Sequence, residues 1–432
     1  MKNLRSLMFF LITASAFLCR GEEDQDLKLG GYLESRMSYF AYEDEMTTAN
    51  ALFRLEGDYD VSDKGKIEAH LLYYYNMQPV DPFSGFREGS VYDKIIDKYY
   101  QESLDGISPV LDDLTPDELD LLNRILDIYS SGYFDNISYS SFFPKETLVM
   151  DRALIKLFFG SSDLIFGKQQ IAWGTGYVFN PTDIWNIKNP TDPDGPRIGV
   201  LAANFDFFFG ENSSFNIIAA PGSNFDNMKY GFRLKSTIGR YEYSFSAVRD
   251  KSDDATILGI PERFQIGSDF SGEIFKGIGF FGEAALSNPR YIGMELSDTD
   301  SAYFQFCTGF DYTFKSGLYV LGEYYYNGLG ENDYKNYDLT AFTRLTGGVM
   351  SGLAEKYISA VVSYPFLNYY NCTLIGLVNP GDMSCALVPE LEYAFHQNIL
   401  VKLNSNIYLG SRSTTEFGGL VNKISFCVTG YF

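Results

Sequence analysis

The chain has 432 residues, with 34 Lys and Arg against 56 Asp and Glu, so its formal net charge is −22. This balance excludes a nucleic-acid-binding protein, because neutralising phosphate groups requires a basic surface. Aromatic residues make up 17% of the chain, yet after the first twenty residues the apolar residues nowhere form a run long enough for a membrane-spanning helix. A helical membrane protein is therefore excluded as well.

The N-terminus has the composition of an export signal. Lys2 and Arg5 form a basic start, Ser6–Leu18 is an apolar run too short to span a bilayer, and Ala14–Ala16 supplies a small-x-small cleavage pattern. We predict a signal peptide over residues 1–16, with cleavage that could extend to residue 21. Cys19 leaves a lipid-modified N-terminus open, although a large residue stands where a small one normally precedes such a cysteine.

Beyond this leader the hydrophobic period is two residues. In the segment 240–249, Tyr241, Tyr243 and Phe245 alternate with Glu242 and Ser244. Alternating segments of about ten residues, separated by turns, are typical of a transmembrane β-barrel, and a soluble β-sandwich shows the same alternation. Short turns alternate with longer polar loops along the chain, which favours the barrel.

We therefore predict an all-β fold, an antiparallel up-and-down transmembrane β-barrel of about 18 strands over residues 27–432. An even number of strands places both termini on one side, and short turns place that side in the periplasm. The strands are predicted to begin near residues 27, 49, 65, 146, 163, 198, 214, 228, 240, 263, 277, 302, 317, 355, 371, 384, 398 and 419.

Residues 79–145 interrupt the strand pattern. They carry 13 acidic and 5 basic side chains, a net charge of −8. Thr115–Glu118 is a capping box with proline at the first helical position, and Leu119 and Leu122 begin an apolar stripe. We predict an acidic, partly helical insert on the outer side of the barrel. It could plug the lumen, cap the mouth as a solvated lid, or extend outward as a binding surface.

The segment 151–197 carries a resemblance to a known family. Gly167–Gly176 reads GKQQIAWGTG, and Phe179–Asp183 reads FNPTD. This stretch resembles the "GKQ-x-x-x-WG-x-G" strand and "NP-x-D" loop of bacterial outer-membrane porins related to the alginate-export type. The resemblance covers about 45 residues and implies a barrel, commonly eighteen-stranded, that passes solutes or polysaccharide.

The same segment is predicted to form a loop of fixed shape. It contains both Trp residues of the chain and four of its fifteen Pro, and proline fixes backbone angles and removes hydrogen-bond donors. We expect this loop to fold inward and narrow the pore, with Trp173 and Trp185 packed on the wall and with Asp183 and Arg197 near the opening. An outer loop packed only on its neighbours is the alternative.

The polar positions of the predicted strands give a set of lumen candidates. The basic and amide members are Arg152, Lys156, Lys168, Gln170, Lys229, Arg233, Lys235 and Lys402, and acidic members include Glu56, Asp58, Asp269, Glu273, Glu390 and Glu392. Rings or ladders of charge set ion preference in pores, so a basic arc could guide an anionic solute such as a uronate oligomer. A polar lumen with compensating charges is the alternative.

No pattern of a catalytic or metal site appears in the chain. There is no GxSxG, HExxH or P-loop sequence, and the two His residues, His70 and His396, lie in unrelated segments. Cys372 and Cys385 flank a predicted hairpin, which leaves a disulfide and two single cysteines both open. We therefore predict neither an enzyme nor a cofactor.

The final strand ends in Phe432 after alternating apolar residues. A terminal aromatic on such a strand matches the signal that hands bacterial outer-membrane proteins to the barrel-assembly machinery, and a chance aromatic is the other interpretation. We predict location in the bacterial outer membrane, in contact with its lipid.

The predicted function is a porin-like channel for passive diffusion of small hydrophilic solutes, anionic solutes and oligosaccharides among them. The alternative is a surface-exposed adhesin or structural barrel that acts through the acidic insert 79–145. A transporter of hydrophobic solutes is a third hypothesis, and the charged lumen candidates argue against it.

Overall fold

The computed structural model describes residues 27–41, 46–76, 90–92, 94, 146–186, 188–191, 199–210, 212–221, 227–250, 262–290, 302–337, 341, 344–345 and 350–432. The predicted signal peptide and Cys19 lie outside the described residues, as do Arg197, the predicted helix that starts at Thr115 and most of the 79–145 insert.

Eighteen strands make up the described structure. They are β1 (Leu27–Ala41), β2 (Met46–Ser62), β3 (Gly65–Asn76), β4 (Glu146–Phe158), β5 (Ser162–Gln169), β6 (Val200–Phe209), β7 (Ser213–Ala220), β8 (Lys229–Ile238), β9 (Tyr241–Asp250), β10 (Glu262–Phe275), β11 (Ile278–Arg290), β12 (Tyr303–Thr313), β13 (Tyr319–Asn327), β14 (Lys356–Phe366), β15 (Tyr370–Asn379), β16 (Ser384–His396), β17 (Ile399–Leu409) and β18 (Asn422–Tyr431).

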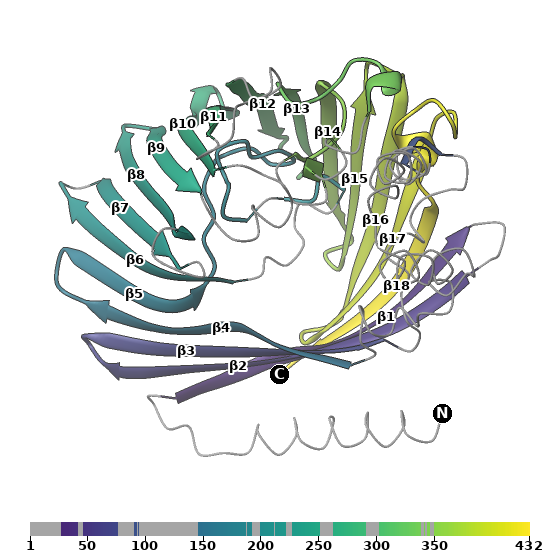
Figure 1. The fold of residues 1–432 in the computed structure, drawn as a ribbon. Helices are drawn as coiled ribbons and strands as arrows, with labels where there is room; N and C mark the ends of the chain where they lie inside the picture. The colour runs from purple at the N-terminus through teal and green to yellow at the C-terminus, as the bar shows by residue number, and fades with distance from the viewer. Residues whose placement is uncertain are drawn as a thin grey trace, which may run out of the picture.

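The strands close into one antiparallel barrel (Figure 1). Each strand pairs with the next along the chain, and β1 pairs with β18 from Tyr32 opposite Tyr431 to Ala41 opposite Asn422. Closure leaves no unpaired sheet edge. The prediction of an 18-stranded barrel is confirmed, and every strand begins within three residues of its predicted start.

The two ends of the barrel differ in how they connect the strands. At one end, the turn end, short turns such as Asp63–Lys64 and Gly239–Arg240 join strands, and β1 begins and β18 ends there. Longer connections leave the opposite end, the loop end. The described helical residues are Val91, Tyr92, Lys94, Ala341, Arg344 and Leu345, and two 3-10 turns span Tyr334–Asn336 and Phe417–Gly419. Among the described residues, no helix has the length and hydrophobicity needed to cross a membrane.

The two faces of the wall follow the predicted alternation. On β9, Phe245 is 47% exposed on the outer face, whereas Ser244 and Ser246 point inward and are 3% and 4% exposed. On β8, Phe232 and Leu234 are likewise exposed. The apolar residues therefore face out of the barrel and the polar residues face its lumen, which is the pattern of a barrel surrounded by lipid.

The structure has no disulfide between Cys372 and Cys385, since all the cysteines it describes are free. The register explains this, because Cys372 on β15 lies opposite Leu391 whereas Cys385 on β16 lies opposite Val378. The two cysteines are six positions apart along the same strand pair, beyond the reach of a disulfide.

Gly167 provides a test of the wall geometry. Its φ is +119°, and a Cβ at this position would lie 2.1 Å from the carbonyl oxygen of Ala153 on β4. We expect Gly167→Ala to lower the free energy of unfolding of the barrel by about 1–3 kcal/mol through backbone strain, measured by urea titration of the refolded protein. Gly322→Ala is the matched control, because no heavy atom lies within 4 Å of a Cβ there. Equal losses in the two variants would contradict the described pairing of β4 with β5.

Candidate functional site

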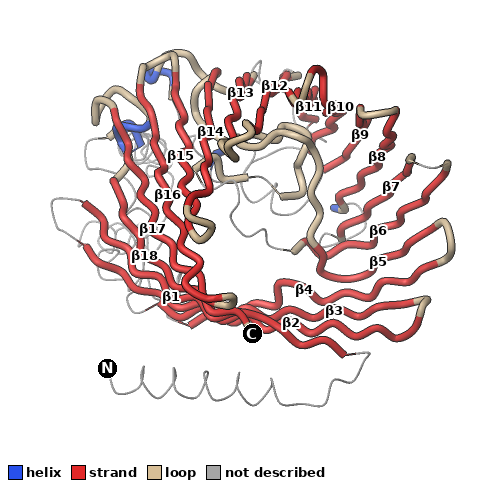
Figure 2. Tube along the Cα trace, turned by 180° about the vertical axis from the view of Figure 1, so that it is seen from behind, coloured by secondary structure: helices blue, strands red, loops and turns tan. Residues whose placement is uncertain are grey.

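A loop that follows β5 lies inside the barrel. We call residues 170–191, all described except residue 187, the inner loop. Figure 2 shows it as a tan tube within the ring of strands. Its apolar residues belong to two buried clusters with inward residues of wall strands between β6 and β16, so it narrows the lumen. The prediction that this loop folds inward agrees with this placement.

Apolar side chains fix the first part of the inner loop to the wall. Trp173 and Trp185 pack edge to face with ring centroids 5.7 Å apart, and both are at most 7% exposed. Together with Ile171 and Ile184 they form one buried cluster with wall residues Ala202, Ile218, Ala220 and Val248. Burial of two indole rings stabilises this contact by several kcal/mol, of the order of 1.5–3 kcal/mol for each large apolar side chain.

Gly231 on β8 makes room for both indoles. A Cβ on Gly231 would lie 2.7 Å from Cζ2 of Trp185 and 2.9 Å from Cη2 of Trp173. Any other residue at this wall position would therefore have to displace the two rings.

A second contact is made by a buried carboxylate under the backbone of the inner loop. Glu323 on β13 is 3% exposed, and its oxygens accept hydrogen bonds from the backbone N–H of Tyr177 (2.8 Å), Val178 (3.2 Å) and Phe179 (2.8 Å). Hydrogen bonds to a charged acceptor are about twice as strong as neutral ones. One wall side chain thus fixes three consecutive residues of the inner loop.

Glu283 on β11 holds the loop in the same way. It is 3% exposed, and its Oε2 accepts from the hydroxyl of Thr182 (2.6 Å) and from the backbone N–H of Thr175 (3.3 Å). The thiol of Cys307 on β12 donates to the carbonyl oxygen of Phe179 at 3.3 Å. Neither Glu283 nor Glu323 was among the predicted site residues, because a single acid on a strand gives no sign that it will meet a backbone segment more than a hundred residues away.

The inner loop also bonds to itself. Lys188 donates to the carbonyl oxygens of Gly176 and Tyr177, both at 2.8 Å, and Asn180 donates to that of Trp173 at 3.1 Å. Asp183 is 1% exposed and accepts from two backbone N–H groups that follow it. Asp183 therefore stabilises a buried turn, and the expectation that it lies near the opening is corrected.

A second apolar cluster joins the inner loop to inward residues of strands β11 to β16. Phe179 stacks on Tyr325 with centroids 4.3 Å apart and lies 5.4 Å from the ring of Tyr357. The cluster extends to Val361 and Leu377 on the neighbouring strands. Phe179 therefore fixes the inner loop to the wall at β13 and β14.

The predicted basic residues of β8 point into the lumen, and each is paired with an acid. Arg233 forms a two-pronged contact with Asp269, at 2.9 and 3.1 Å. Lys229 lies 3.3 Å from Asp250 and donates to the carbonyl oxygen of Ile184 in the inner loop. Lys235 lies 2.8 Å from Glu242 on β9.

The basic residues of β4 and β17 are paired as well. Lys156 lies 2.8 Å from Glu68, and Arg152 donates to Gln170 at 2.5 Å while its Nε lies 3.9 Å from Asp151. Lys402 lies between Glu390 and Glu392, at 3.1 and 3.0 Å. These side chains form a wall of compensated charge.

Lys168 departs from the expectation that it lines the pore. The inward residues of β5 are Gly167 and Gln169, and Gln169 is 3% exposed with its amide bonded to Asn204 on β6. Alternation places Lys168 on the outer face, opposite the exposed Leu201. The GKQQ sequence gave three polar residues in a row, so a period of two could not be assigned from it.

One cluster among the described residues has donor atoms close enough together to suggest a metal ion. It consists of Asp58, Glu68 and His70. Their oxygens and nitrogen are already engaged by cations: Lys66 lies 2.9 Å from Asp58 and 3.1 Å from Glu68, and Arg54 bonds to Nδ1 of His70 at 2.9 Å. This donor set does not fit a metal ion.

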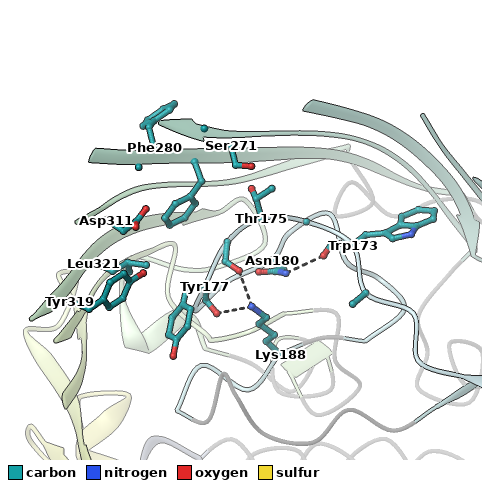
Figure 3. Close-up of a pocket in the computed structure, with 16 residues that line it drawn as sticks. Trp173, Thr175, Tyr177, Asn180, Lys188, Ser271, Phe280, Asp311, Tyr319 and Leu321 are labelled. Atoms are coloured by element: carbon teal, nitrogen blue, oxygen red, sulfur yellow. Dashed lines mark hydrogen bonds between the residues drawn. The ribbon is translucent and has the colours of Figure 1, made fainter. Parts of the chain in front are cut away.

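A cavity of about 560 Å³ lies between the inner loop and strands β10 to β13 (Figure 3). Trp173, Thr175 and Tyr177 of the loop line one side, and Asp311 and Tyr319 of the wall line the other. Its volume is that of a typical small-molecule site. We call the part of the lumen that the inner loop narrows the constriction. The constriction and this cavity together form the candidate functional site.

Comparisons with known proteins support the fold. Neither a protein-family model nor a curated protein sequence matches the chain. Among solved structures, OccK8 (OprE) of Pseudomonas aeruginosa is similar with a TM-score of 0.55 and 9% identity, over 94% of this chain and 98% of that one. The outer membrane protein OpdK of the same organism gives 0.53 and 9% identity, over 94% and 99%. OccAB4 of Acinetobacter baumannii gives 0.53 and 9%, over 95% and 100%. These likenesses show a shared barrel fold, and the resemblance to the alginate-export type stays a prediction.

Glu416 joins several connections at the loop end. It is 2% exposed and accepts hydrogen bonds from the hydroxyl of Tyr357 (2.6 Å), the backbone N–H of Leu353 (2.9 Å) and the amide of Asn379 (3.0 Å). Burial, with a further contribution from the nearby Asp382 carboxylate, raises the pKa of Glu416 to about 7. We call the loop-end connections that Glu416 joins the rim. The carboxyl group of Glu416 takes up a proton more readily when the rim is folded than when it is unfolded.

Replacement of Gly231 tests the packing of the inner loop. We expect Gly231→Val to push both indoles from their cluster, so that tryptophan emission shifts to longer wavelength and iodide quenches it more strongly. Trp173 and Trp185 are the only Trp residues of the chain, so the signal reports on this loop alone. Gly322→Val, on the outer face of β13, should leave the emission unchanged. Unchanged emission in both variants would contradict the described contact.

The pKa of Glu416 predicts a pH-dependent rim. Because the folded pKa, about 7, exceeds the ordinary value of 4.5, the rim is most stable below about pH 4.5 and loses stability as pH rises to about 7. Hydrogen exchange of the Leu353 amide, corrected for its intrinsic pH dependence, should show falling protection over this interval. Glu416→Gln should abolish the trend, and persistence of the trend in that variant would assign it to another group.

Proposed function

We propose that the protein is a passive diffusion channel of the bacterial outer membrane for small hydrophilic solutes. One observation carries the proposal: a closed 18-stranded barrel has an apolar outer face, a charged inner face and a loop that narrows its lumen. Barrels of 16 to 18 strands are wide enough for an aqueous path. No described element provides a nucleotide site or another means of energy coupling, so a concentration gradient would drive transport.

The outer face supports a lipid environment. Large apolar side chains such as Leu201, Phe264, Leu286, Phe310 and Leu403 are between 45% and 56% exposed. An exposed surface of this kind around a whole barrel would aggregate in water, whereas lipid covers it. The similar structure of OpdK is described as an outer membrane protein, which agrees with this assignment.

The turn end is proposed to face the periplasm, because outer-membrane barrels have short periplasmic turns and longer outer loops. Both ends of the barrel domain, Leu27 and Phe432, lie at this end. Recognition of β18 by the assembly machinery is part of the same proposal. Contact with lipid follows from the outer face described above.

Charge pairing argues against the anionic solutes expected from the sequence. Each lumen-facing basic residue of the wall strands named above has an acidic neighbour within 4 Å. By contrast, Asp163, Asp206 and Asp311 point inward and have no basic partner among the described ion pairs, and Asp163 lies directly opposite Asp206. We therefore propose that the channel passes cations more readily than anions.

The adhesin hypothesis concerns the insert 79–145, of which only residues 90–92 and 94 are described. Val91 and Tyr92 pack at the loop end against Tyr337 and Leu353, which ties the insert to the rim. No described contact favours a binding surface for a host or matrix partner, so this alternative stays a prediction.

A cysteine pair on one strand tests the channel. Asp311 faces the lumen, and its neighbour Phe310 faces outward and is 53% exposed. In a background with Cys372→Ser and Cys385→Ser, we expect a bulky thiol reagent added from the water to lower the single-channel current of Asp311→Cys stepwise. It should leave the current of Phe310→Cys unchanged. A refolded barrel that conducts no ions, or equal block of both variants, would contradict the proposal.

A further inference from the structure

The cavity between the inner loop and the wall has both charged and aromatic side chains in its lining. It lies on the turn-end side of the constriction, because Ser271 and Asp311 stand near the turn ends of β10 and β12 and Tyr319 begins β13. A solute that crosses the constriction passes this space. The inference below rests on the proposed channel function.

The charges of the cavity cancel. Asp311 and Lys188 are the two charged residues among those that line it, so its formal charge is zero. Lys188 is held by two loop carbonyl oxygens, and Asp311 comes from the opposite wall. A solute with a net negative charge meets Asp311, and one with a net positive charge meets Lys188. Neither sign of charge is favoured at this place, although the lumen as a whole favours cations.

The remaining lining supplies hydroxyl groups and ring faces. Ser271 and Thr175 carry hydroxyl groups that both donate and accept, and Tyr177 and Tyr319 present aromatic rings from the two sides (Figure 3). Gly174 and Gly176 also line the loop side of the cavity. A ligand that fits this lining needs C–H faces to cover the rings and several hydroxyl groups to exchange hydrogen bonds with the polar groups.

We propose that the cavity is a binding site for an uncharged polyhydroxy solute, a mono- or disaccharide. Asp311 accepts hydrogen bonds from two sugar hydroxyls and determines the specificity of the site. Tyr177 and Tyr319 cover the apolar faces of the sugar ring. The site slows the solute at the constriction and raises its local concentration there.

Binding is tested on the refolded full-length protein in detergent, without a membrane, by isothermal titration with maltose. Glucuronate and glucosamine serve as the matched anionic and cationic probes. We expect saturable binding of maltose and weaker binding of both charged probes. Asp311→Ala should weaken maltose binding about tenfold, the loss expected when a hydrogen-bonded charged group is removed.

Asp163→Ala is the matched control, because Asp163 is another inward acid but does not line the cavity, and it should bind maltose as the wild type does. Tyr319→Leu is a second test of the site. It removes a ring without changing the charge of the cavity, and it should weaken maltose binding. Absence of saturable maltose binding, tighter binding of either charged probe, or equal loss in Asp163→Ala and Asp311→Ala would overturn the inference. Conductance in a planar bilayer is measured on the same preparation: current without sugar binding rejects the sugar site and keeps the channel, whereas absence of current rejects the channel itself.

Discussion

The structure depends on a backbone segment that is held inside a barrel by two buried carboxylates. Glu323 alone accepts three consecutive N–H groups of the inner loop, and Glu283 accepts a backbone N–H and a hydroxyl. A loop without strand partners leaves its N–H groups unpaired, and a buried unpaired group costs about 1–3 kcal/mol. The two acids remove that cost and in turn receive the hydrogen bonds that a buried polar group requires.

The two indoles and Phe179 complete the attachment. The carboxylates fix the backbone in the middle of the loop, while Trp173 and Trp185 fix its flanks on β6 to β9, and Phe179 fills the wall of β13 and β14. The inner loop is therefore attached to the wall on both sides of the lumen.

Much of the fold could be predicted from the sequence, because the residues of a barrel repeat one simple rule. The alternation of Tyr243 and Phe245 with Ser244 and Ser246 sets the register of β9, and the same rule sets each other strand. It failed at Lys168, where three polar residues in succession hid the period, and β5 ends one residue later.

The site was predictable only in part. Tryptophan and proline content indicated a rigid inward loop, but the residues that hold it are spread over β8, β11 and β13. Gly231, Glu283 and Glu323 gain their roles from the closure of the barrel, which brings together segments 50 to 150 residues apart. Salt-bridge partners such as Asp269 for Arg233 depend on the register between strands in the same way. The basic arc was inferred from one strand at a time, and acids on neighbouring strands neutralise it.

The most direct test of this account is the single-channel conductance of Glu323→Ala beside the wild type. The account predicts a larger conductance with more frequent fluctuations, because three loop N–H groups lose their acceptor and the inner loop leaves the constriction. The outward-facing neighbour Tyr324→Ala should leave the conductance unchanged. A Glu323→Ala barrel of normal stability with wild-type conductance would show that the inner loop does not limit the pore.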